Sequence, residues 1–365
     1  MNASAPYEAR QKKLAERVSS EGLEALWVTN LVNIRYLTGF TGSYAQLLIT
    51  PEGSYFFSDG RYREQADKEV RGCAVRIFVG STWLEIFAEE ISDHDWKTMG
   101  IEAAHLNVST FEEIKKLPSG KGSVDWRPTV SWVEELRVCK DESEKETLRR
   151  SSQVVDRVFA ALIQELEEGV SEREILRKMM NLLWEEGATG PSFDPIVLFG
   201  ARSSLPHGKP GDARLNEGDW VLLDFGAVVD GYCSDCTRTF VFGDPDDLQR
   251  ERHALVHEAQ KAGIAAARAG VAGKDADAAS RRVLEEAGLA EAFMHGLGHG
   301  VGLEIHEAPR LASSSKDVLK SGAVVTVEPG IYIPGWGGIR IEDAVVVGNG
   351  DPEPLTFCDH SICPL

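Results

Sequence analysis

The apolar positions in the first third of the chain change their spacing several times. Between Tyr7 and Glu21 they recur with the period of an amphipathic helix. The runs that follow are short and rich in β-branched and aromatic residues, which predicts strands at 25–30, 45–50, 54–59 and 74–80. Helical spacing returns at 82–92 and 109–117. Strands mixed with helices in this way predict an α/β domain, which we place at residues 1–135.

A different pattern begins after residue 135. A long amphipathic helix is expected to start near Asp141 or Glu142 and to end by Gly169. A second helix is expected from Ser171, where Glu174 completes a capping box. Further along, the pattern predicts helices at 246–269 and 273–287 and strands at 195–200, 323–334 and 338–347. Helices combined with antiparallel strands predict a second domain of α+β class at residues 136–365.

The excess of acidic residues disfavours some classes of binding partner. The chain has 365 residues, of which 58 are acidic and 39 basic, and its formal net charge is −19 at pH 7. This charge repels phosphate backbones and anionic lipid headgroups, so we expect neither nucleic acid nor a membrane as a partner. The first 22 residues lack the apolar stretch of a signal peptide, and six scattered cysteines are not a disulfide framework. A cytoplasmic location is therefore expected.

Two strand-like runs are joined by an Asp-Gly pair at 230–231, a strong signal for a two-residue hairpin turn. With this turn, Asp224 lies opposite Thr237. Asp235 lies opposite Gly226 and becomes a diagonal neighbour of Asp224 on the same face of the sheet. Buried carboxylates without a positive partner are unfavourable, which points to a bound cation. The alternative is a pair of ordinary surface carboxylates.

The same hairpin contains a C-x-x-C pair, Cys233 and Cys236, with Asp235 between them. Side chains alternate faces along an extended strand, so Cys233 and Asp235 share one face and Cys236 lies on the other. Two thiols on opposite faces cannot easily share a metal ion or close a disulfide. We therefore expect packing roles for both cysteines and a functional role for the acid.

A glycine-rich stretch concentrates three of the nine histidines in twelve residues, namely His295, His299 and His306. A single histidine is more often a structural residue, but the grouping and the glycines, which permit close backbone approach, favour a site. Glu328 and Glu342 each interrupt an otherwise apolar run and repeat the problem of a buried acid. The patterns G-x-G-x-x-G, H-E-x-x-H and G-x-S-x-G do not occur, so dinucleotide, single-zinc-helix and serine-nucleophile sites are not supported.

Four carboxylates and one or two imidazoles form a donor set of mostly hard oxygen atoms. Such a set suits Mn²⁺, with Co²⁺ or Zn²⁺ as alternatives, better than a metal that prefers thiolates. Four acids require two divalent ions to balance their charge. A pair of ions about 3.5–4 Å apart can hold a bridging hydroxide and polarise a carbonyl group, so these residues predict a hydrolase.

The order and surroundings of these residues resemble the "pita-bread" metallopeptidases, which include methionine aminopeptidase, aminopeptidase P and prolidase. The motifs LPHG, SDCTRTF, HGLGHGVGLEIHE, VEPGIY and GIRIED are similar to the aminopeptidase P and prolidase branch. NIRYLTGFTGSYAQLLIT and FFSDGRYREQA resemble the N-terminal domain of that branch, which methionine aminopeptidases lack. The resemblance covers nearly the whole chain. It implies a pita-bread catalytic domain preceded by a smaller creatinase-type α/β domain.

The resemblance also implies roles for individual residues. Asp224 would chelate one ion, His299 and Glu328 would hold the other, and Asp235 and Glu342 would bridge the two. Glu328 would also transfer the proton from the nucleophilic water to the leaving nitrogen. Three histidines would position the substrate and stabilise the tetrahedral intermediate, namely His207, His295 and His306. Strand geometry adds two supporting residues. Arg340, two positions before Glu342, is expected to share its strand face and to be a bidentate partner of the bridging pair. Thr237, opposite Asp224, is expected to hydrogen-bond a ligand carboxylate, with an ordinary strand-forming residue as the alternative.

By resemblance, the expected activity is hydrolysis of the bond between an N-terminal residue and proline in short peptides, by a homodimer. We expect the aminopeptidase P type because of the first domain, in which Asp59, Arg61 and Tyr62 match the family pattern but are expected to be structural. The alternative is prolidase, which cleaves only Xaa-Pro dipeptides and needs a cation for the proline carboxylate, for which Arg310 is the candidate. An inactive pita-bread binding module and a metal-free creatinase are disfavoured, because such relatives lose ligands that are all present here.

Overall fold

The computed structural model describes residues 5–119 and 122–364. The chain divides into two compact units, with the boundary between Arg137 and Val138. The first four residues of the segment expected to lack a signal peptide lie outside the described residues. No helix in the described part of the chain is long and apolar enough to cross a membrane.

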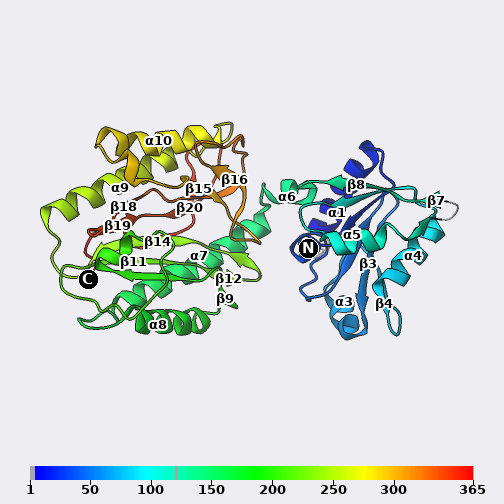
Figure 1. Cartoon of the computed structure of the whole chain (residues 1–365), viewed down its shortest axis with the longest axis horizontal. Helices are drawn as coiled ribbons and strands as arrows, with labels where there is room; N and C mark the ends of the chain where they lie inside the picture. Colours follow the sequence, from blue (N-terminus) through cyan, green and yellow to red (C-terminus); the bar gives the residue numbers. More distant parts are fainter. Residues whose placement is uncertain (1–4, 120–121, 365) are drawn as a thin grey trace. The chain divides into compact units, whose positions relative to one another are not determined.

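A six-stranded mixed sheet forms the centre of the first unit, in the order β4-β3-β2-β1-β5-β8 (Figure 1). Its inner strands are antiparallel, whereas β4, β5 and β8 are added in parallel. The strands are β1 (Ala25–Val28), β2 (Gln46–Ile49), β3 (Ser54–Asp59), β4 (Ala74–Phe78), β5 (Thr98–Glu102) and β8 (Asp125–Thr129). A separate two-stranded ribbon contains β6 (Pro118–Ser119) and β7 (Gly122–Ser123). All four strands predicted for this part of the sequence are present.

The helices of the first unit are α1 (Ala5–Ser20), α2 (Leu31–Thr38), α3 (Arg63–Glu69), α4 (Trp83–His94), α5 (Val108–Ile114) and α6 (Trp132–Arg137). The three helices predicted from periodicity correspond to α1, α4 and α5. Trp27 of β1 packs with Phe87 and Ile91 of α4 in the core of one face. In the short 3₁₀ turn η1 (Gly60–Tyr62), Asp59 accepts a hydrogen bond from the backbone of Arg61, which is the structural role expected for it.

Two helix pairs enclose the strands of the second unit (Figure 1). One pair, α7 (Glu142–Ile163) and α8 (Glu172–Glu185), shares a core with β10 (Ile196–Phe199), β11 (Trp220–Phe225) and β14 (Cys236–Val241). The other pair, α9 (Asp247–Ala266) and α10 (Gly273–Glu286), packs on the five-stranded sheet β16-β15-β17-β20-β21 and on the ribbon of β18 and β19. The strands of that sheet are β15 (Gly298–Gly300), β16 (Glu307–Leu311), β17 (Val324–Val327), β20 (Asp343–Val346) and β21 (Glu353–Pro354), and those of the ribbon are β18 (Gly330–Ile333) and β19 (Gly337–Arg340). The capping box predicted at Ser171 is formed, and Asp141 forms one at the start of α7 as well.

The hairpin has the predicted register. Asp224 lies opposite Thr237, and Val229 lies opposite Tyr232 across the two-residue turn. Around Gly226 and Asp235 the hairpin leaves the sheet of β11 and β14. Its outer part, β12 (Ala227–Val229) and β13 (Tyr232–Cys233), joins a second sheet with β9 (Gly190–Pro191). A Cβ atom on Gly226 would lie 1.8 Å from the Ser234 carbonyl oxygen, so only glycine permits this close crossing.

The two strands predicted at 323–334 and 338–347 are each broken in two. The first divides into β17 and β18 around Glu328 and Pro329, and the second divides into β19 and β20 around Glu342. In both cases the chain changes sheets at the break. Pro329 cannot donate a backbone hydrogen bond, which ends pairing there. Both glutamates therefore lie at corners between sheets, where a side chain can point into a shared interior.

Candidate metal centre

The five predicted metal ligands converge in the second unit from separate strands. Asp224 lies in β11 and His299 in β15, whereas the other three lie where strands change sheets, namely Asp235, Glu328 and Glu342. Ligand atoms of Asp235, His299 and Glu342 all lie within 4.8 Å of one another. His299 Nε2 lies 3.6 Å from Asp235 Oδ2 and 3.5 Å from Glu328 Oε1. Carboxylate oxygen and imidazole nitrogen atoms that can ligate a metal ion thus lie close together in one small region.

Burial and mutual repulsion disfavour ionised carboxylates in this region. Burial, followed by the charges of Glu342 and Asp224, raises the pKa of Asp235 well above its ordinary range. Burial, then Glu328 and Asp224, does the same for the pKa of Glu342. For Glu328, burial raises the pKa to about 8, opposed by Arg340 and reinforced by Asp224. All three carboxylates will ionise readily only beside added positive charge.

The histidine of the cluster is suited to bind a metal. Burial lowers the pKa of His299 to about 4, so its imidazole is neutral at physiological pH. Its Nδ1 atom lies 3.0 Å from the Gly300 carbonyl oxygen, which orients the ring so that Nε2 faces the carboxylates. Hard oxygen donors with one neutral imidazole match the preferences of first-row divalent ions. The residues present therefore fit the divalent cations that the resemblance implies.

Two polar residues support the carboxylates from neighbouring strands. Thr237 Oγ1 donates to Glu342 Oε2 at 2.7 Å, which confirms the hydrogen bond expected for this threonine. Arg340 differs from the expectation, because its Nη2 atom contacts Asp224 at 2.5 Å instead of bridging Asp235 and Glu342. Arg340 Nε also donates to Thr237 Oγ1 at 3.1 Å, so the side chains of Arg340 and Glu342 meet at one hydroxyl group, and the guanidinium supports Glu342 through Thr237.

His295 and Arg340 are linked through Tyr332, a residue of the VEPGIY motif for which no role is predicted from the sequence. Arg340 can only donate, so its Nη1 gives a hydrogen bond to the Tyr332 hydroxyl at 2.6 Å. The hydroxyl proton then points to His295 Nε2, 2.8 Å away, while Nδ1 donates to the Gly296 carbonyl oxygen at 2.8 Å. Both ring nitrogens of His295 are thus occupied within the protein. In this structure His295 orients Tyr332 and does not offer a free nitrogen to a substrate.

The other two histidines lie at the rim. The ring of His306 packs edge-to-face on that of His299, with ring centroids 4.4 Å apart. Burial, then the charges of Arg310 and His207, lowers the pKa of His306, which places those two residues near it. His207 is exposed, and the neighbouring Pro206 carbonyl oxygen accepts a hydrogen bond from Arg340 at 3.5 Å.

The C-x-x-C cysteines stay outside the cluster. Cys233 packs in one apolar group with Leu148 and Val301, whereas Cys236 packs in another with Phe159. Both are buried free thiols. The two cysteines therefore lie on opposite faces, as predicted.

Comparison with known families agrees with this geometry. Residues 146–349 match "Metallopeptidase family M24", and residues 10–139 match "Creatinase/Prolidase N-terminal domain". The predicted pita-bread fold with a creatinase-type first domain is confirmed by these matches and by solved structures.

The chain is similar over almost its whole length to several relatives. It is 36% identical to a Xaa-Pro dipeptidase of Pyrococcus furiosus, covering 97% of this chain and 99% of the relative. A Xaa-Pro dipeptidase structure from Bacillus anthracis matches with a TM-score of 0.94 at 37% identity, covering 98% of this chain and 99% of that one. An X-Pro aminopeptidase structure from Thermotoga maritima matches with a TM-score of 0.87 at 35% identity, covering 97% of this chain and 99% of that one. The chain belongs to metallopeptidase family M24.

Proposed function

We propose that this protein is a dinuclear metal-dependent peptidase that hydrolyses the bond between an N-terminal residue and proline. The observation that carries the proposal is the group of Asp235, His299 and Glu342, in which both carboxylates are buried, completed by Asp224 and Glu328. The relatives named Xaa-Pro dipeptidase and X-Pro aminopeptidase support proline specificity. An inactive binding module would have no reason to keep five such ligands together.

The proposed ligands are the five residues predicted from the sequence, and we infer Mn²⁺ as the native ion from their oxygen-rich donor set. When bound, two divalent ions acidify a water molecule and polarise the peptide carbonyl group. The ions would be held by Asp224, Asp235, His299, Glu328 and Glu342. Thr237 and Arg340 fix Glu342 and Asp224 in turn.

Glu328 is the proposed carrier of the proton that moves from water to the leaving nitrogen. Its side chain is 19% exposed, against 7% for Asp235 and 11% for Asp224, so it is the most accessible of these three carboxylates. His306 lies at the rim against His299 and could contact the substrate carbonyl oxygen. His207 is exposed near it and is proposed to contact the substrate as well.

Dipeptides are the favoured substrates in this proposal. Arg310 lies directly opposite His299 in the pairing of β15 and β16, and its charge helps to lower the pKa of His306. An exposed guanidinium beside the cluster is suited to bind the carboxylate of a C-terminal proline. The first domain does not favour aminopeptidase P, because relatives named as dipeptidase and as aminopeptidase both span nearly the whole chain.

A peptide panel with Mn²⁺ tests the proposal. Cleavage of Ala-Pro alone indicates a dipeptidase, and cleavage of Ala-Pro-Ala indicates the aminopeptidase P type. Cleavage of Ala-Ala-Ala or Met-Ala-Ser would contradict proline specificity. Arg310→Gln should raise KM for Ala-Pro with little change in kcat, whereas Arg268→Gln, which removes a surface pair with Asp351, should change neither.

The proposal includes a cytoplasmic homodimer. The acidic composition and the free cysteines support the compartment, and the resemblance to the branch supports the dimer. Light scattering on the purified protein measures the oligomeric state directly. Metal analysis of the same sample separates the peptidase from an inactive module, which would contain no divalent ion.

A further inference from the structure

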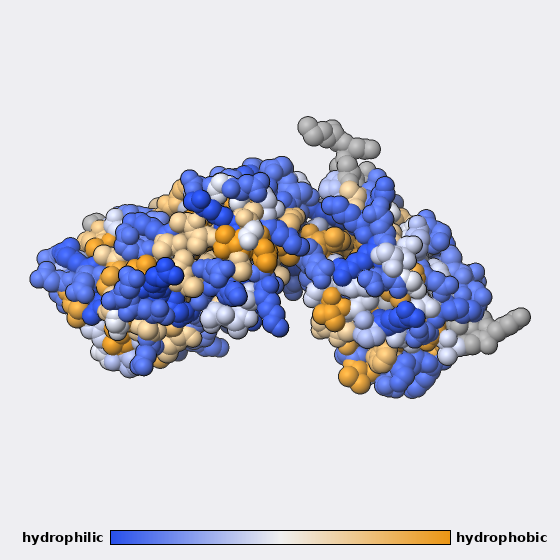
Figure 2. All heavy atoms as spheres, turned by 90° about the horizontal axis from the view of Figure 1, so that it is seen from above, coloured by the Kyte–Doolittle hydropathy of each residue, from blue (hydrophilic) through white to orange (hydrophobic). Residues whose placement is uncertain are grey.

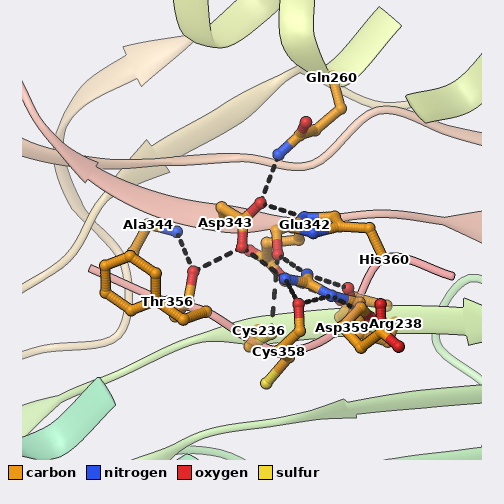
Figure 3. Close-up of polar contacts among 12 residues, drawn as sticks. Cys236, Arg238, Gln260, Glu342, Asp343, Ala344, Thr356, Cys358, Asp359 and His360 are labelled. Atoms are coloured by element: carbon orange, nitrogen blue, oxygen red, sulfur yellow. Dashed lines mark hydrogen bonds and ion pairs between the residues drawn. The ribbon is translucent and has the colours of Figure 1, made fainter. Parts of the chain in front are cut away.

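A buried arginine lies on the face of β14 opposite to the metal centre. Arg238 follows Thr237 in the chain and is 2% exposed. Its Nη1 atom donates to the backbone oxygens of both Thr237 and Glu342, and its Nη2 atom donates to the Asp343 side chain at 2.7 Å (Figure 3). Thr237 and Glu342 are the same two residues whose side chains are joined inside the metal centre. Arg238 therefore holds the backbone of Thr237 and Glu342 and makes no hydrogen bond to their side chains.

The remaining donors of this guanidinium bind the end of the chain, which we call the C-terminal segment (Phe357–Ile362). Nε lies 3.2 Å from the carbonyl oxygens of Cys358 and Asp359, and Nη2 lies 2.9 Å from that of Cys358. The segment is fixed at both ends, because the Phe357 backbone donates to Asp156 of α7 and the Ile362 carbonyl oxygen accepts from Val241 of β14. All N–H groups of Arg238 thus have acceptors.

Asp343, which follows Glu342 in the chain, is surrounded as completely as Arg238 (Figure 3). Oδ1 accepts from Arg238 and from Thr356 at 2.6 Å, while Oδ2 accepts from Gln260 at 2.6 Å and lies 2.7 Å from His360 Nε2. The side chains of Arg238 and Asp343 are 3% and 5% exposed. Apolar residues of similar volume are often as stabilising as a buried ion pair, so stability alone does not explain this pair.

We propose that Arg238 is a positioning residue for the metal centre, which acts by holding β14 and the Glu342 backbone at a fixed spacing with the help of Asp343 and the C-terminal segment. The inference rests on the proposed metal site. The backbone of β14 sets where Thr237 and Asp235 point, and the Glu342 carbonyl group sets where its carboxylate points. A change of a few tenths of an ångström between these strands would alter the ligand spacing, and such outer contacts typically change metal affinity by about 10–100-fold.

Metal binding to the metal-free protein tests this inference without any peptide. Arg238→Lys keeps the charge but cannot reach all the acceptors in one plane, so its dissociation constants for Mn²⁺, measured by calorimetry, should rise about tenfold or more. The visible absorption spectrum of the Co²⁺ form should also change, because it reports ligand geometry. Arg137→Lys is the matched control, since Arg137 is equally buried but belongs to the first unit. It should leave both readouts unchanged.

A double variant separates positioning from stability. Arg238→Met with Asp343→Leu removes both charges and leaves no unpaired ion, so it should recover much of the stability that Arg238→Met alone loses. Metal affinity should remain low in the double variant, because the Glu342 and Thr237 carbonyl groups still lack the hydrogen bonds from Arg238 Nη1. His360→Ala removes one contact to Asp343 and should give a smaller loss of affinity. Wild-type affinity and Co²⁺ spectrum in folded Arg238→Lys would overturn the inference, whereas tight metal binding without Xaa-Pro hydrolysis would overturn only the proposed function.

Discussion

Thr237 Oγ1 lies 2.7 Å from Glu342 Oε2, and the Glu342 backbone donates to the Thr237 carbonyl oxygen at 3.1 Å. Although the two residues are 105 positions apart in the sequence, they are joined by one side-chain and one backbone hydrogen bond. One oxygen of Glu342 is held by the side-chain bond, and a carboxylate oxygen of Glu342 lies within 4.8 Å of ligand atoms of Asp235 and His299. The orientation of the Glu342 carboxylate, a proposed bridging ligand, therefore depends on Thr237, which is not one of the proposed metal ligands.

Thr237→Val should weaken metal binding about tenfold, within the range typical of lost outer contacts. Valine keeps the β-branched shape in the strand but cannot donate to Glu342, so the carboxylate can rotate. Calorimetric titration of the metal-free variant with Mn²⁺ measures the change. Thr129→Val removes a buried threonine hydroxyl that bonds the Ile101 carbonyl oxygen in the first unit, and it should bind Mn²⁺ as the wild type does. Equal affinities for both variants would contradict the assignment.

Asp235→Asn should abolish peptidase activity while stabilising the metal-free protein. The substitution removes one of several buried carboxylates that raise each other's pKa values, so less repulsion remains when no cation is present. The increase in Tm that Mn²⁺ produces in the wild type should disappear, because a bridging ligand is gone. Thermal unfolding with and without Mn²⁺ measures both effects. Asp230→Asn, at the exposed hairpin turn, is the control, and retained turnover in Asp235→Asn would refute the two-metal assignment.

The hairpin shows what local sequence signals can predict. The Asp-Gly pair adopts positive φ at both Asp230 and Gly231, and such a turn sets the pairing of every residue behind it. The pairing of Asp224 with Thr237 therefore followed from the turn alone. The strand breaks at Glu328 and Glu342 could not be predicted from local sequence, because residues distant in sequence determine which strands pair.

The sequence predicted which side chains lie near the carboxylates better than it predicted their hydrogen-bond partners. Arg340 was placed near the carboxylates by its spacing from Glu342, but its pairing with Asp224 and Tyr332 depends on three separate strands. Arg238 gave no signal at all, because an arginine at an alternate strand position has the pattern of a surface residue. Its guanidinium is enclosed by the C-terminal segment, Asp343 and the Glu342 backbone, all of which are distant from it in sequence. On the face drawn in Figure 2, hydrophilic residues predominate and hydrophobic ones are interspersed among them.

Lys140→Met should destabilise the protein by about 3–5 kcal/mol, the usual effect of leaving one member of a buried ion pair alone. Lys140 Nζ lies 3.2 Å from Glu307 Oε2, and the two side chains are 1% and 6% exposed. Glu307 also accepts a hydrogen bond from the Glu304 backbone, so the pair closes the loop that carries His306. Urea unfolding measures the change.

Two further variants check the reason for that loss. Lys145→Met removes an ion pair with the exposed Glu142, and it should cost less than about 1 kcal/mol. Adding Glu307→Leu to Lys140→Met should restore part of the stability, because no buried charge then lacks a partner. A loss for Lys140→Met as small as that for Lys145→Met would show that the buried pair is not important for the fold.

His253 should make the protein less stable as the pH falls from 7 to 5. It is buried on α9, and burial, reinforced by the charges of His257, His360 and Arg238, lowers its pKa to about 4 from an ordinary value of 6.5. The folded protein therefore takes up this proton less readily than the unfolded chain, so the stabilisation is complete above pH 6.5 and is lost as the pH falls toward 4. For one such group the loss at pH 5 is about 2 kcal/mol.

His253→Gln tests this assignment, because glutamine can still donate to the Thr239 carbonyl oxygen, which lies 3.1 Å from His253 Nε2, but does not titrate. Urea unfolding of the wild type and the variant is compared at pH 5 and pH 8, with a chelator present so that metal release contributes to neither. The free energy of unfolding should fall less on acidification in the variant, by about 2 kcal/mol. The carboxylates of the metal centre titrate in both proteins and cancel in the comparison. Parallel pH profiles would mean that His253 is protonated as easily in the folded protein as in the unfolded chain, which its burial beside three positive or protonatable groups argues against.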